Sequence, residues 1–308
     1  MQRRYRIGTR GSKLALIQAN EVARRIALAS HAPVEEVTEI VVISTAGDRV
    51  QDRALSEIGG KGLFTQEIEE QLADARIDVA VHSMKDMPTL LPDGLIIDCL
   101  LERADPRDAF ISLTAGSLAE LSAGARVGTS SLRRAAQLRA RRPDLEVVPF
   151  RGNVDTRLRK LGEGVADATF LAVAGLTRMG LAGKITAPLS PEDMLPAVAQ
   201  GAIGIERRAA DDEAAHLLAK LHHEETGLRV AAERACLAVL DGSCRTPIAA
   251  LAEITGERMR LRAMILTPDG REIHETEREG LAADAIAMGE DAGGELKGRA
   301  GPDFFDTV

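Results

Sequence analysis

The chain has 308 residues, of which 45% are hydrophobic, and this length favours two or three globular domains over a single core. Its 39 Lys and Arg residues against 47 Asp and Glu residues give a formal net charge of −8, and aromatic residues make up only 2% of the chain. An acidic chain with so few aromatic side chains argues against a nucleic-acid-binding protein.

Neither a membrane span nor a signal segment is predicted. The chain has no uninterrupted apolar stretch of about 18 residues, and its first residues run straight into a strand-like segment in place of an apolar signal core. The cysteines Cys99, Cys236 and Cys244 are far apart and form no CxxC pair, so neither a disulfide framework nor a zinc site is expected. We therefore expect a cytoplasmic protein that holds no metal and contacts no membrane.

Strands and helices alternate through the N-terminal part of the chain. Apolar residues recur at helical spacing over residues 15–29, directly after Ser12, which is a natural N-cap. Such alternation predicts a doubly wound α/β lobe whose ligands lie beyond the carboxyl ends of parallel strands. Strands are predicted at residues 4–8, 40–44 and 77–81, and a further helix at residues 63–75.

The same alternation resumes after residue 106 and predicts a second α/β lobe. Beyond residue 218 the pattern changes to helices that flank alternating strand segments and a Pro268-Asp269-Gly270 turn, which predicts a small α+β domain. The strands of the second lobe are predicted at residues 109–113, 126–128, 145–150 and 169–174. In the last domain, helices are predicted at residues 229–240 and 282–296, and strands at residues 248–254, 259–266 and 272–277.

One stretch of the chain reverses the sign of the charge. Residues 126–160 contain ten basic and three acidic side chains, a local charge of +7 in a chain whose net charge is −8. Arginines fixed in a cleft bind carboxylate or phosphate through their planar, forked donors, so this contrast indicates an anion site.

Strand-to-helix loops supply the candidate anion donors. Thr129 and Ser131 stand where a strand ends and a helix begins, so free backbone N–H groups and the helix dipole favour an anion there. Ordinary N-capping is the alternative, but the adjacent Arg133 and Arg134 favour anion binding. Further candidate donors are Arg151, Gly152 and Arg157, which follow another predicted strand, and Arg10 and Ser12, which occupy the equivalent strand-to-helix loop in the first lobe.

The loop after the third predicted strand brings together an imidazole, a hydroxyl, an amine and a carboxylate, from His82, Ser83, Lys85 and Asp86. A polar turn with a Lys85–Asp86 surface pair would be enough to explain these residues. The alternative gives Asp86 an acid–base or cation-stabilising role, with Lys85 and Ser83 holding a substrate.

Cys244 is the candidate reactive thiol. It lies in a turn after a predicted helix, beside Arg245, whose charge favours the thiolate. Cys99 and Cys236 lie among apolar residues and are expected in the core, and the sequence leaves open that Cys244 is a bystander. The glycine-rich segment around Lys61 lacks the spacing of a phosphate-binding loop and is interpreted as a mobile loop.

Seven motifs follow one another over nearly the whole chain: TRGSKLAL (9–16), GKGLF (60–64), HSMKD (82–86), VGTSSLRR (127–134), RGN (151–153), LAVAGL (171–176) and QGA (200–202). In this order they resemble the hydroxymethylbilane synthases, also called porphobilinogen deaminases. Two positions depart from the family pattern, Ala199 and Ser243, where glycine is common, and either change could alter the local freedom of the backbone.

The resemblance implies a fold class. It consists of two doubly wound α/β lobes like those of periplasmic binding proteins, followed by a small α+β C-terminal domain that carries the reactive cysteine. The chain is also expected to return to the first lobe near Gln200, which makes that domain discontinuous. The expected domains are residues 1–101 with 202–219, residues 102–201, and residues 220–308.

The resemblance further implies a transferase of tetrapyrrole and haem biosynthesis. The family's cysteine, here Cys244, forms a thioether to a dipyrromethane cofactor that primes chain growth. Porphobilinogen units then lose ammonia and add head to tail, and hydrolysis releases the linear tetrapyrrole hydroxymethylbilane. Loss of ammonia leaves a cationic azafulvene, whose charge a carboxylate beside the pyrrole N–H should stabilise. Asp86 is the candidate for this role.

Each pyrrole carries acetate and propionate groups, so a growing chain requires a cleft lined by arginines. We expect a monomer with porphobilinogen as its small-molecule substrate. A solute receptor with two lobes around an anion cleft is the competing class, but a receptor would not need Asp86 or a modified Cys244. The positions that match the family's cofactor- and substrate-binding residues are Arg10, Ser12, Ser83, Lys85, Thr129, Ser131, Arg133, Arg134, Arg151, Gly152, Arg157, Arg178 and Gln200, with Lys61 and Phe64 in an active-site loop.

Overall fold

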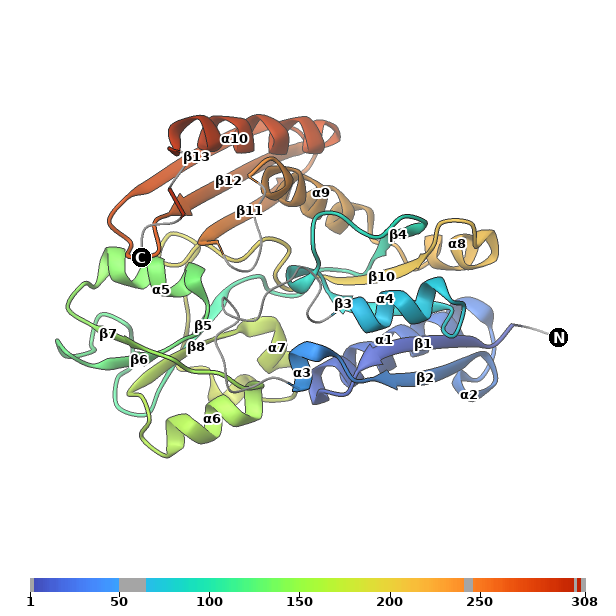
Figure 1. The fold of residues 1–308 in the computed structure, drawn as a ribbon, viewed down its shortest axis with the longest axis horizontal. Helices are drawn as coiled ribbons and strands as arrows, with labels where there is room; N and C mark the ends of the chain where they lie inside the picture. The colour runs from blue at the N-terminus through green and yellow to red at the C-terminus, as the bar shows by residue number, and fades with distance from the viewer. Residues whose placement is uncertain (1–2, 50–64, 241–245, 302–303, 306–308) are drawn as a thin grey trace. The chain divides into compact units, whose positions relative to one another are not determined.

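The computed structural model describes residues 3–49, 65–240, 246–301 and 304–305 (Figure 1). Contacts between Cα atoms group the chain into two compact units. Among the described residues, the first unit combines those up to Ala104 with Ala202–Gly227, and the second combines Asp105–Gly201 with those from Leu228 onward. The first unit is therefore built from two separate pieces of the chain. The division into three domains, with the boundaries given above, stays a prediction.

A five-stranded mixed sheet forms the centre of the first unit, in the order β2-β1-β3-β10-β4 (Figure 1). Strand β1 runs parallel to β2 and β3, whereas β10 runs antiparallel to β3 and β4. The sequence analysis predicted the three parallel strands and missed the other two. The strands are β1 Tyr5–Arg10, β2 Thr38–Ile43, β3 Val79–Ser83, β4 Leu95–Leu100 and β10 Ile203–Arg208.

Helices cover both faces of this sheet. On one face, Val22 and Ile26 of α1 pack with Val79 of β3 in a buried cluster. On the other face, Ile68 of α4 packs with Ala80, the next residue of β3. Because neighbouring residues of a strand point to opposite faces, α1 and α4 lie on opposite sides of the sheet. The helices are α1 Lys13–Ser30, α2 Val34–Val37, α3 Ala46–Arg49, α4 Gln66–Ala73 and α8 Asp212–Ala219.

Ion pairs tie the residues before β1 to the rest of the first unit. Arg3 contacts Asp78 at 2.9 Å and Asp211 at 2.7 Å. Asp211 also caps α8, because its carboxylate accepts a hydrogen bond from the backbone N–H of Ala214 at 3.1 Å. Hydrogen bonding from Arg3 lowers the pKa of Asp211 to about 2. The Asp211 carboxylate therefore stabilises the folded state while it is ionised.

Replacing Asp211 by asparagine should lower the free energy of unfolding at neutral pH by about 1 to 2 kcal/mol, since asparagine keeps the helix cap and removes the charge. Because the folded pKa lies below the unfolded value of about 3.9, the stabilisation is present above that value and is lost as the pH falls through about 2. Urea unfolding of both proteins at neutral pH and at the acid end of this range checks the prediction. A difference in unfolding free energy that persists undiminished in acid would contradict it.

A second five-stranded sheet, in the order β7-β6-β8-β5-β9, forms the centre of the second unit. Strand β6 runs parallel to β7 and β8, and β5 runs antiparallel to β8 and β9. The side chains of Phe110 and Phe170 pack on one face of this sheet, and Phe150 packs on the other. The strands are β5 Asp108–Ser112, β6 Arg126–Gly128, β7 Glu146–Val148, β8 Ala168–Ala172 and β9 Ala187–Pro188, and the helices are α5 Leu132–Arg141, α6 Val154–Gly162 and α7 Val173–Arg178.

The predicted strand at residues 169–174 is too long at its end. Strand β8 stops at Ala172, and helix α7 begins at Val173. Val173 and Ala174 are buried, as are the strand residues Ala168 to Leu171, and only Ala172 between them is half-buried. An apolar run that is buried over almost its whole length shows no clear periodicity, so the sequence does not distinguish the end of a strand from the start of a helix there.

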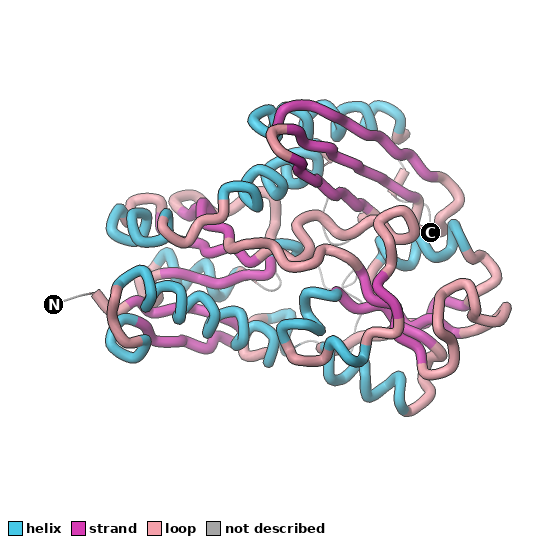
Figure 2. The backbone as a smooth tube through the Cα atoms, turned by 180° about the vertical axis from the view of Figure 1, so that it is seen from behind, coloured by secondary structure: helices cyan, strands magenta, loops and turns pink. Residues whose placement is uncertain are grey.

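The C-terminal part of the second unit is an antiparallel three-stranded sheet, β11-β12-β13, with α10 packed against β12 and β13. Figure 2 shows the three strands side by side. Helices α9 and α10 approach closely at Gly289, where a Cβ atom would collide with the backbone carbonyl of Ala232. The elements are α9 Glu224–Val239, β11 Ile248–Thr255, β12 Arg258–Leu266, β13 Ile273–Leu281 and α10 Ala285–Arg299.

Two properties of the described residues bear on the sequence predictions. None of the helices there combines the length and the apolar character that crossing a bilayer requires. The same part of the chain contains no group of three or more His, Cys, Asp or Glu side chains placed to hold a metal ion.

Candidate functional site

The carboxyl ends of β1 and β3 bring the predicted residues of the first unit to one edge of its sheet. Arg10 is the last residue of β1 and Ser83 the last of β3. Because these strands are parallel neighbours, their ends meet at the same edge. Ser12 caps α1 as predicted, since its hydroxyl accepts a hydrogen bond from the backbone N–H of Ala15 at 3.3 Å.

Ser83 is held by a residue that the sequence analysis did not single out. Gln18 lies on α1 and its side chain is buried. Its amide nitrogen donates to the Ser83 hydroxyl at 2.9 Å, and its amide oxygen accepts from the same hydroxyl at 3.1 Å. The pair ties the start of α1 to the end of β3, so the two loops at this edge are fixed to each other.

Lys85 and Asp86 are exposed on a short 3₁₀ turn, Met84–Asp86. Met84 holds this turn in place, because its side chain is 2% exposed and its backbone N–H donates to the carbonyl of Ala202 at 3.1 Å. The buried Met84 therefore fixes the position of the Asp86 backbone, while the Asp86 carboxylate stays exposed.

His82, which precedes this turn, points into the protein. Its Nε2 atom lies 2.9 Å from a carboxylate oxygen of Glu206 on β10, and both side chains are buried. Glu69 of α4 is close enough for its charge to interact with Glu206. Burial, with the nearby Glu206 charge, raises the pKa of Glu69. His82 thus joins β3 to β10 inside the first unit and does not face the exposed turn.

The second unit repeats the arrangement at the carboxyl ends of β6, β7 and β8. Ser131 caps α5 by accepting a hydrogen bond from the backbone N–H of Arg134 at 3.4 Å. Asn153 caps α6 in the same way, with the N–H of Thr156 at 2.9 Å. Thr129 is buried, and its hydroxyl accepts from the backbone N–H of Ser131 at 3.2 Å. Both loops therefore lead into helical N-termini at one sheet edge. The sequence analysis predicted the helix after Ser131 and did not predict the one after Asn153.

Arg133 and Arg134 lie inside the second unit. Each is 5% exposed, and both contact the fully buried carboxylate of Asp108, at 2.8 Å from Arg133 and 2.6 Å from Arg134. The sequence analysis expected two arginines lining a cleft and did not identify Asp108 as their counter-ion. That partner could not be found from the local pattern, because it is 26 positions from Arg134 along the chain.

The Asp108 carboxylate is ionised in spite of its burial. Burial alone would raise its pKa, but the charges of Arg133 and Arg134 and their hydrogen bonds outweigh burial and lower the pKa. Gln200 adds a further contact, because its amide nitrogen donates to Asp108 at 3.0 Å and to the carbonyl of Pro106 at 2.7 Å. One carboxylate thus joins three of the predicted site residues.

Arg151 follows β7, and its Nη1 nitrogen is buried without a hydrogen-bond partner among the described residues. Gly152 has φ of +120°, which favours glycine, and a Cβ atom there would lie 2.5 Å from the side chain of Thr156. Arg157 donates through Nε to the carbonyl of Gly152 at 2.9 Å, and Arg178 donates to the carbonyl of Gly201 at 2.8 Å. The contact from Arg157 holds the loop from which Arg151 extends, whereas the contact from Arg178 joins the end of α7 to Gly201.

Three predicted residues, Lys61, Phe64 and Cys244, lie outside the described part of the chain. The two other cysteines are described and are buried. Burial raises the pKa of Cys99 and of Cys236 to about 12, so both stay protonated and unreactive near neutral pH.

The donors of the second unit fit a cofactor that carries carboxylate groups. Arg133 Nε and Arg151 Nη1 are both buried, and neither has a hydrogen-bond partner among the described residues. A buried guanidinium N–H without an acceptor is costly, and a carboxylate is the acceptor that it binds most strongly. Acetate and propionate groups on a dipyrromethane would supply such acceptors.

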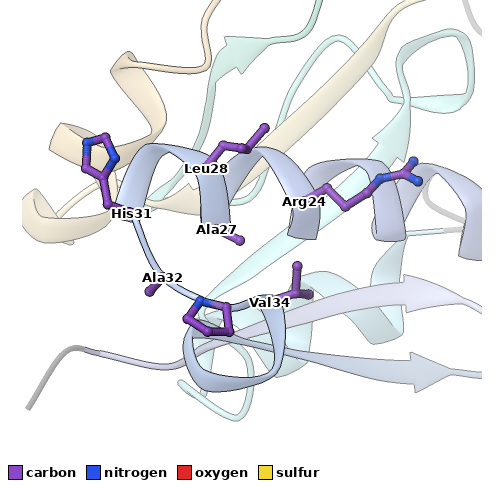
Figure 3. Close-up of a pocket in the computed structure, with 7 residues that line it drawn as sticks. Arg24, Ala27, Leu28, His31, Ala32 and Val34 are labelled. Atoms are coloured by element: carbon purple, nitrogen blue, oxygen red, sulfur yellow. The ribbon is translucent and has the colours of Figure 1, made fainter.

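An apolar groove lies elsewhere in the first unit, at the C-terminal end of α1 (Figure 3). It contains no carboxylate or thiol, and its charged or titratable side chains are Arg24 and His31. Ser12 caps the opposite end of the same helix. The groove is therefore separate from the residues that the sequence analysis singled out.

Comparison with known proteins identifies the family. The model described as "Porphobilinogen deaminase, dipyromethane cofactor binding domain" matches residues 5–216, and "Porphobilinogen deaminase, C-terminal domain" matches residues 227–298. A porphobilinogen deaminase of Paracoccus denitrificans is 60% identical over 305 residues, which cover 99% of this chain and 97% of the relative. A chloroplastic porphobilinogen deaminase of Oryza sativa subsp. japonica is 55% identical over 307 residues, which cover 98% of this chain and 86% of the relative.

Solved structures with a similar arrangement include a periplasmic substrate-binding protein of an ABC transporter from Coxiella burnetii. It has a TM-score of 0.44 and 16% identity, and the match covers 71% of this chain and 92% of that one. The methionine-binding protein MetQ has a TM-score of 0.44 and 14% identity, with 71% and 88% covered. The two family models and the two full-length relatives agree, and the chain belongs to the porphobilinogen deaminase family, the transferases that build a linear tetrapyrrole from porphobilinogen.

Proposed function

We propose that this chain adds porphobilinogen units head to tail to a bound dipyrromethane, with loss of ammonia at each addition, and releases hydroxymethylbilane. The observation that carries the proposal is the match to the family over nearly the whole chain, including the dipyrromethane cofactor-binding domain. The buried guanidinium N–H groups of Arg133 and Arg151, which have no partner among the described residues, support a ligand rich in carboxylates.

The arginines bind the acidic side groups of the growing chain. In the second unit, Arg151 follows β7, Arg157 lies near the start of α6, and Arg178 is the last residue of α7. In the first unit, Arg10 ends β1 and Lys85 lies in the turn after β3. Each charge-assisted hydrogen bond contributes about 1.5 to 3 kcal/mol. Several such bonds retain the intermediate through successive additions. Ser12, Ser83, Thr129, Ser131, Gly152 and Gln200 shape the loops that carry these donors.

Asp86 stabilises the positive charge that develops when the aminomethyl group of porphobilinogen leaves as ammonia. An exposed carboxylate on an anchored turn can approach the pyrrole N–H of the substrate without moving the backbone. A fixed negative charge aimed at a developing cation lowers the barrier, because the charge needs no reorganisation during the reaction. The carboxylate can also take the pyrrole N–H as a hydrogen-bond donor and so orient the ring.

Cys244 attaches the cofactor in this proposal, through a thioether. When bound, the dipyrromethane supplies the terminal pyrrole that accepts the first unit. Cys99 and Cys236 are poor alternatives, because burial keeps their thiols protonated. The three cysteines are far apart in the sequence and form no evident disulfide framework, which is typical of proteins in the reducing cytoplasm. We therefore place the protein in the cytoplasm, and we propose that it acts as a monomer.

The intact mass of the purified protein tests this function. The wild-type chain should be heavier than its sequence by one dipyrromethane, and Cys244→Ser should show the sequence mass and no turnover, since a hydroxyl is a far weaker nucleophile than a thiolate. Cys99→Ser is the matched control and should retain the added mass, because its thiol is buried. A wild-type chain of bare sequence mass that still consumes porphobilinogen would overturn the attachment.

A further inference from the structure

A buried cluster of three titratable side chains lies in the first unit and has no part in the function proposed above. It consists of His82 on β3, Glu206 on β10 and Glu69 on α4, which are 6%, 0% and 7% exposed. The Nε2 atom of His82 lies 2.9 Å from Oε2 of Glu206. The charges of His82 and Glu206 both act on Glu69, so the three side chains titrate as one cluster.

The pairing of β3 with β10 places this cluster directly before the turn that carries Asp86. His82 lies opposite Gly204 in the antiparallel register, and Glu206, two residues further along β10, points to the same face of the sheet. Met84 packs against the same glycine, since a Cβ atom at Gly204 would collide with its sulfur atom. The cluster and the buried end of the turn therefore lie against one stretch of β10.

The cluster has an excess of negative charge if both of its carboxyl groups are ionised. One imidazole supplies at most one positive charge against two carboxylates, and a buried charge without a partner is strongly destabilising. In addition, Oε1 of Glu69 and Oε1 of Glu206 are buried, and neither has a hydrogen-bond partner among the described residues. Protonation of one carboxyl group removes the excess charge and supplies an O–H donor to the cluster.

The surroundings of the two carboxyl groups indicate which of them takes this proton. Glu206 already has His82 within hydrogen-bond distance, whereas none of the described residues forms an ion pair with Glu69. Burial raises the pKa of Glu69 and the charge of Glu206 raises it further, while Thr65 and the charge of His82 act more weakly in the opposite direction. The proton therefore belongs on Glu69.

We propose that Glu69 is the protonated member of this cluster, and that Glu69 and Glu206 are positioning residues that hold His82 and the following turn in place for Asp86. The ionised Glu206 then pairs with a protonated His82, and the cluster has no net charge. Loss of the Glu69 proton puts a second negative charge beside Glu206, which weakens the contact between β3 and β10 and displaces the turn. The effect on the reaction rests on the proposed role of Asp86.

Turnover of porphobilinogen across the pH range tests the proposal. Glu69→Gln has the shape of a protonated carboxyl and no proton to lose, so it should match the wild-type chain near neutral pH and lose less turnover as the pH rises. Glu206→Gln removes the partner of His82 and should reduce turnover by about 10- to 100-fold, as expected for a small displacement of a reacting group. Glu70→Gln, an exposed neighbour on α4, is the matched control and should follow the wild-type chain at every pH.

Two outcomes of this experiment would overturn the proposal. One is a loss of turnover in Glu69→Gln as large as that in Glu206→Gln, and the other is an identical alkaline fall in Glu69→Gln and the wild-type chain. The second comparison decides the question even if Glu206→Gln does not fold.

Urea unfolding gives a readout that does not involve the reaction. Because the folded pKa of Glu69 is raised, its proton stabilises the fold below the unfolded value of about 4.3, and this stabilisation is lost as the pH rises through the folded pKa. The unfolding free energy of the wild-type chain should therefore fall relative to that of Glu69→Gln as the pH rises. Parallel pH dependences of the two proteins would contradict the assignment of the proton.

Infrared spectroscopy detects the proton itself. At neutral pH the wild-type chain should show the C=O stretching band of a buried, protonated carboxyl group, which Glu69→Gln should lack and Glu70→Gln should retain. Spectra without this difference would refute the proposal. If Asp86→Ala keeps its turnover, the proposed function fails separately, and the infrared band still decides the protonation state of Glu69.

Discussion

Replacing Asp86 by alanine should leave the chain folded and reduce porphobilinogen consumption by about a thousandfold. The side chain is exposed, so its removal opens no cavity. The substitution should slow the chemical step and not unfold the protein, because the Asp86 carboxylate stabilises a positive charge that develops only as ammonia leaves. Single-turnover consumption of porphobilinogen measures the rate of the chemical step, and thermal unfolding measures the fold.

Asp93→Ala is the matched control for this change. Asp93 is also an exposed aspartate of the first unit, a few residues further along the chain, and lies outside the site. It should keep its turnover. Asp86→Asn, which keeps the shape and removes the charge, should resemble Asp86→Ala. Near-normal consumption by a folded Asp86→Ala protein would show that this carboxylate does not stabilise the developing cation.

Replacing Arg151 by leucine should weaken binding of the growing chain by about 10- to 100-fold, which corresponds to one charge-assisted contact of about 1.5 to 3 kcal/mol. Its Nη1 nitrogen is buried and has no acceptor among the described residues, so the substitution removes no hydrogen bond of that nitrogen within the described protein. The fold should therefore be affected less than the affinity. The loaded fraction by intact mass and the rate of elongation measure the effect.

Arg159→Leu serves as the control for Arg151→Leu. Arg159 lies on the next helix, α6, is exposed, and pairs with Glu163 at 2.6 Å one turn away. Such a surface pair contributes about 0.3 to 0.5 kcal/mol. Its loss should change neither loading nor elongation. If elongation by Arg151→Leu equals that of Arg159→Leu, the charge argument fails for this arginine.

Local signals in the sequence predicted much of the fold. The N-caps at Ser12 and Ser131 depend on contacts within a few residues, and the structure confirms both caps. Anion binding at Thr129 and Ser131 stays a prediction. The two-lobed α/β fold followed by α+β elements is confirmed as well. The antiparallel strands β4 and β10 were missed, because each is defined by a partner that is distant in the sequence.

The same limit applies to the candidate site. The count of charges indicated that residues 126–160 bind an anion. It could not show that Asp108, which lies outside this stretch, forms ion pairs with two of its arginines and offsets part of the positive charge. The role of Gln18 was also missed, because only the packing of α1 beside β3 brings it to Ser83. Only the folded structure shows that all three side-chain nitrogens of Arg134 have partners within the protein, whereas Nε of Arg133 and Nη1 of Arg151 have none among the described residues.

The position of β10 between β3 and β4 sets the order in which the protein can assemble during synthesis. The ribosome releases β3 and β4 well before β10, with all of Asp105–Gly201 in between. Until β10 is synthesised, the edges of β3 and β4 that pair with it have no partner. The intervening segment can already form its own sheet from β5 to β9 during that time. Closure of the first sheet is thus a late event, and a ribosome stalled before Ile203 would leave its nascent chain open to aggregation.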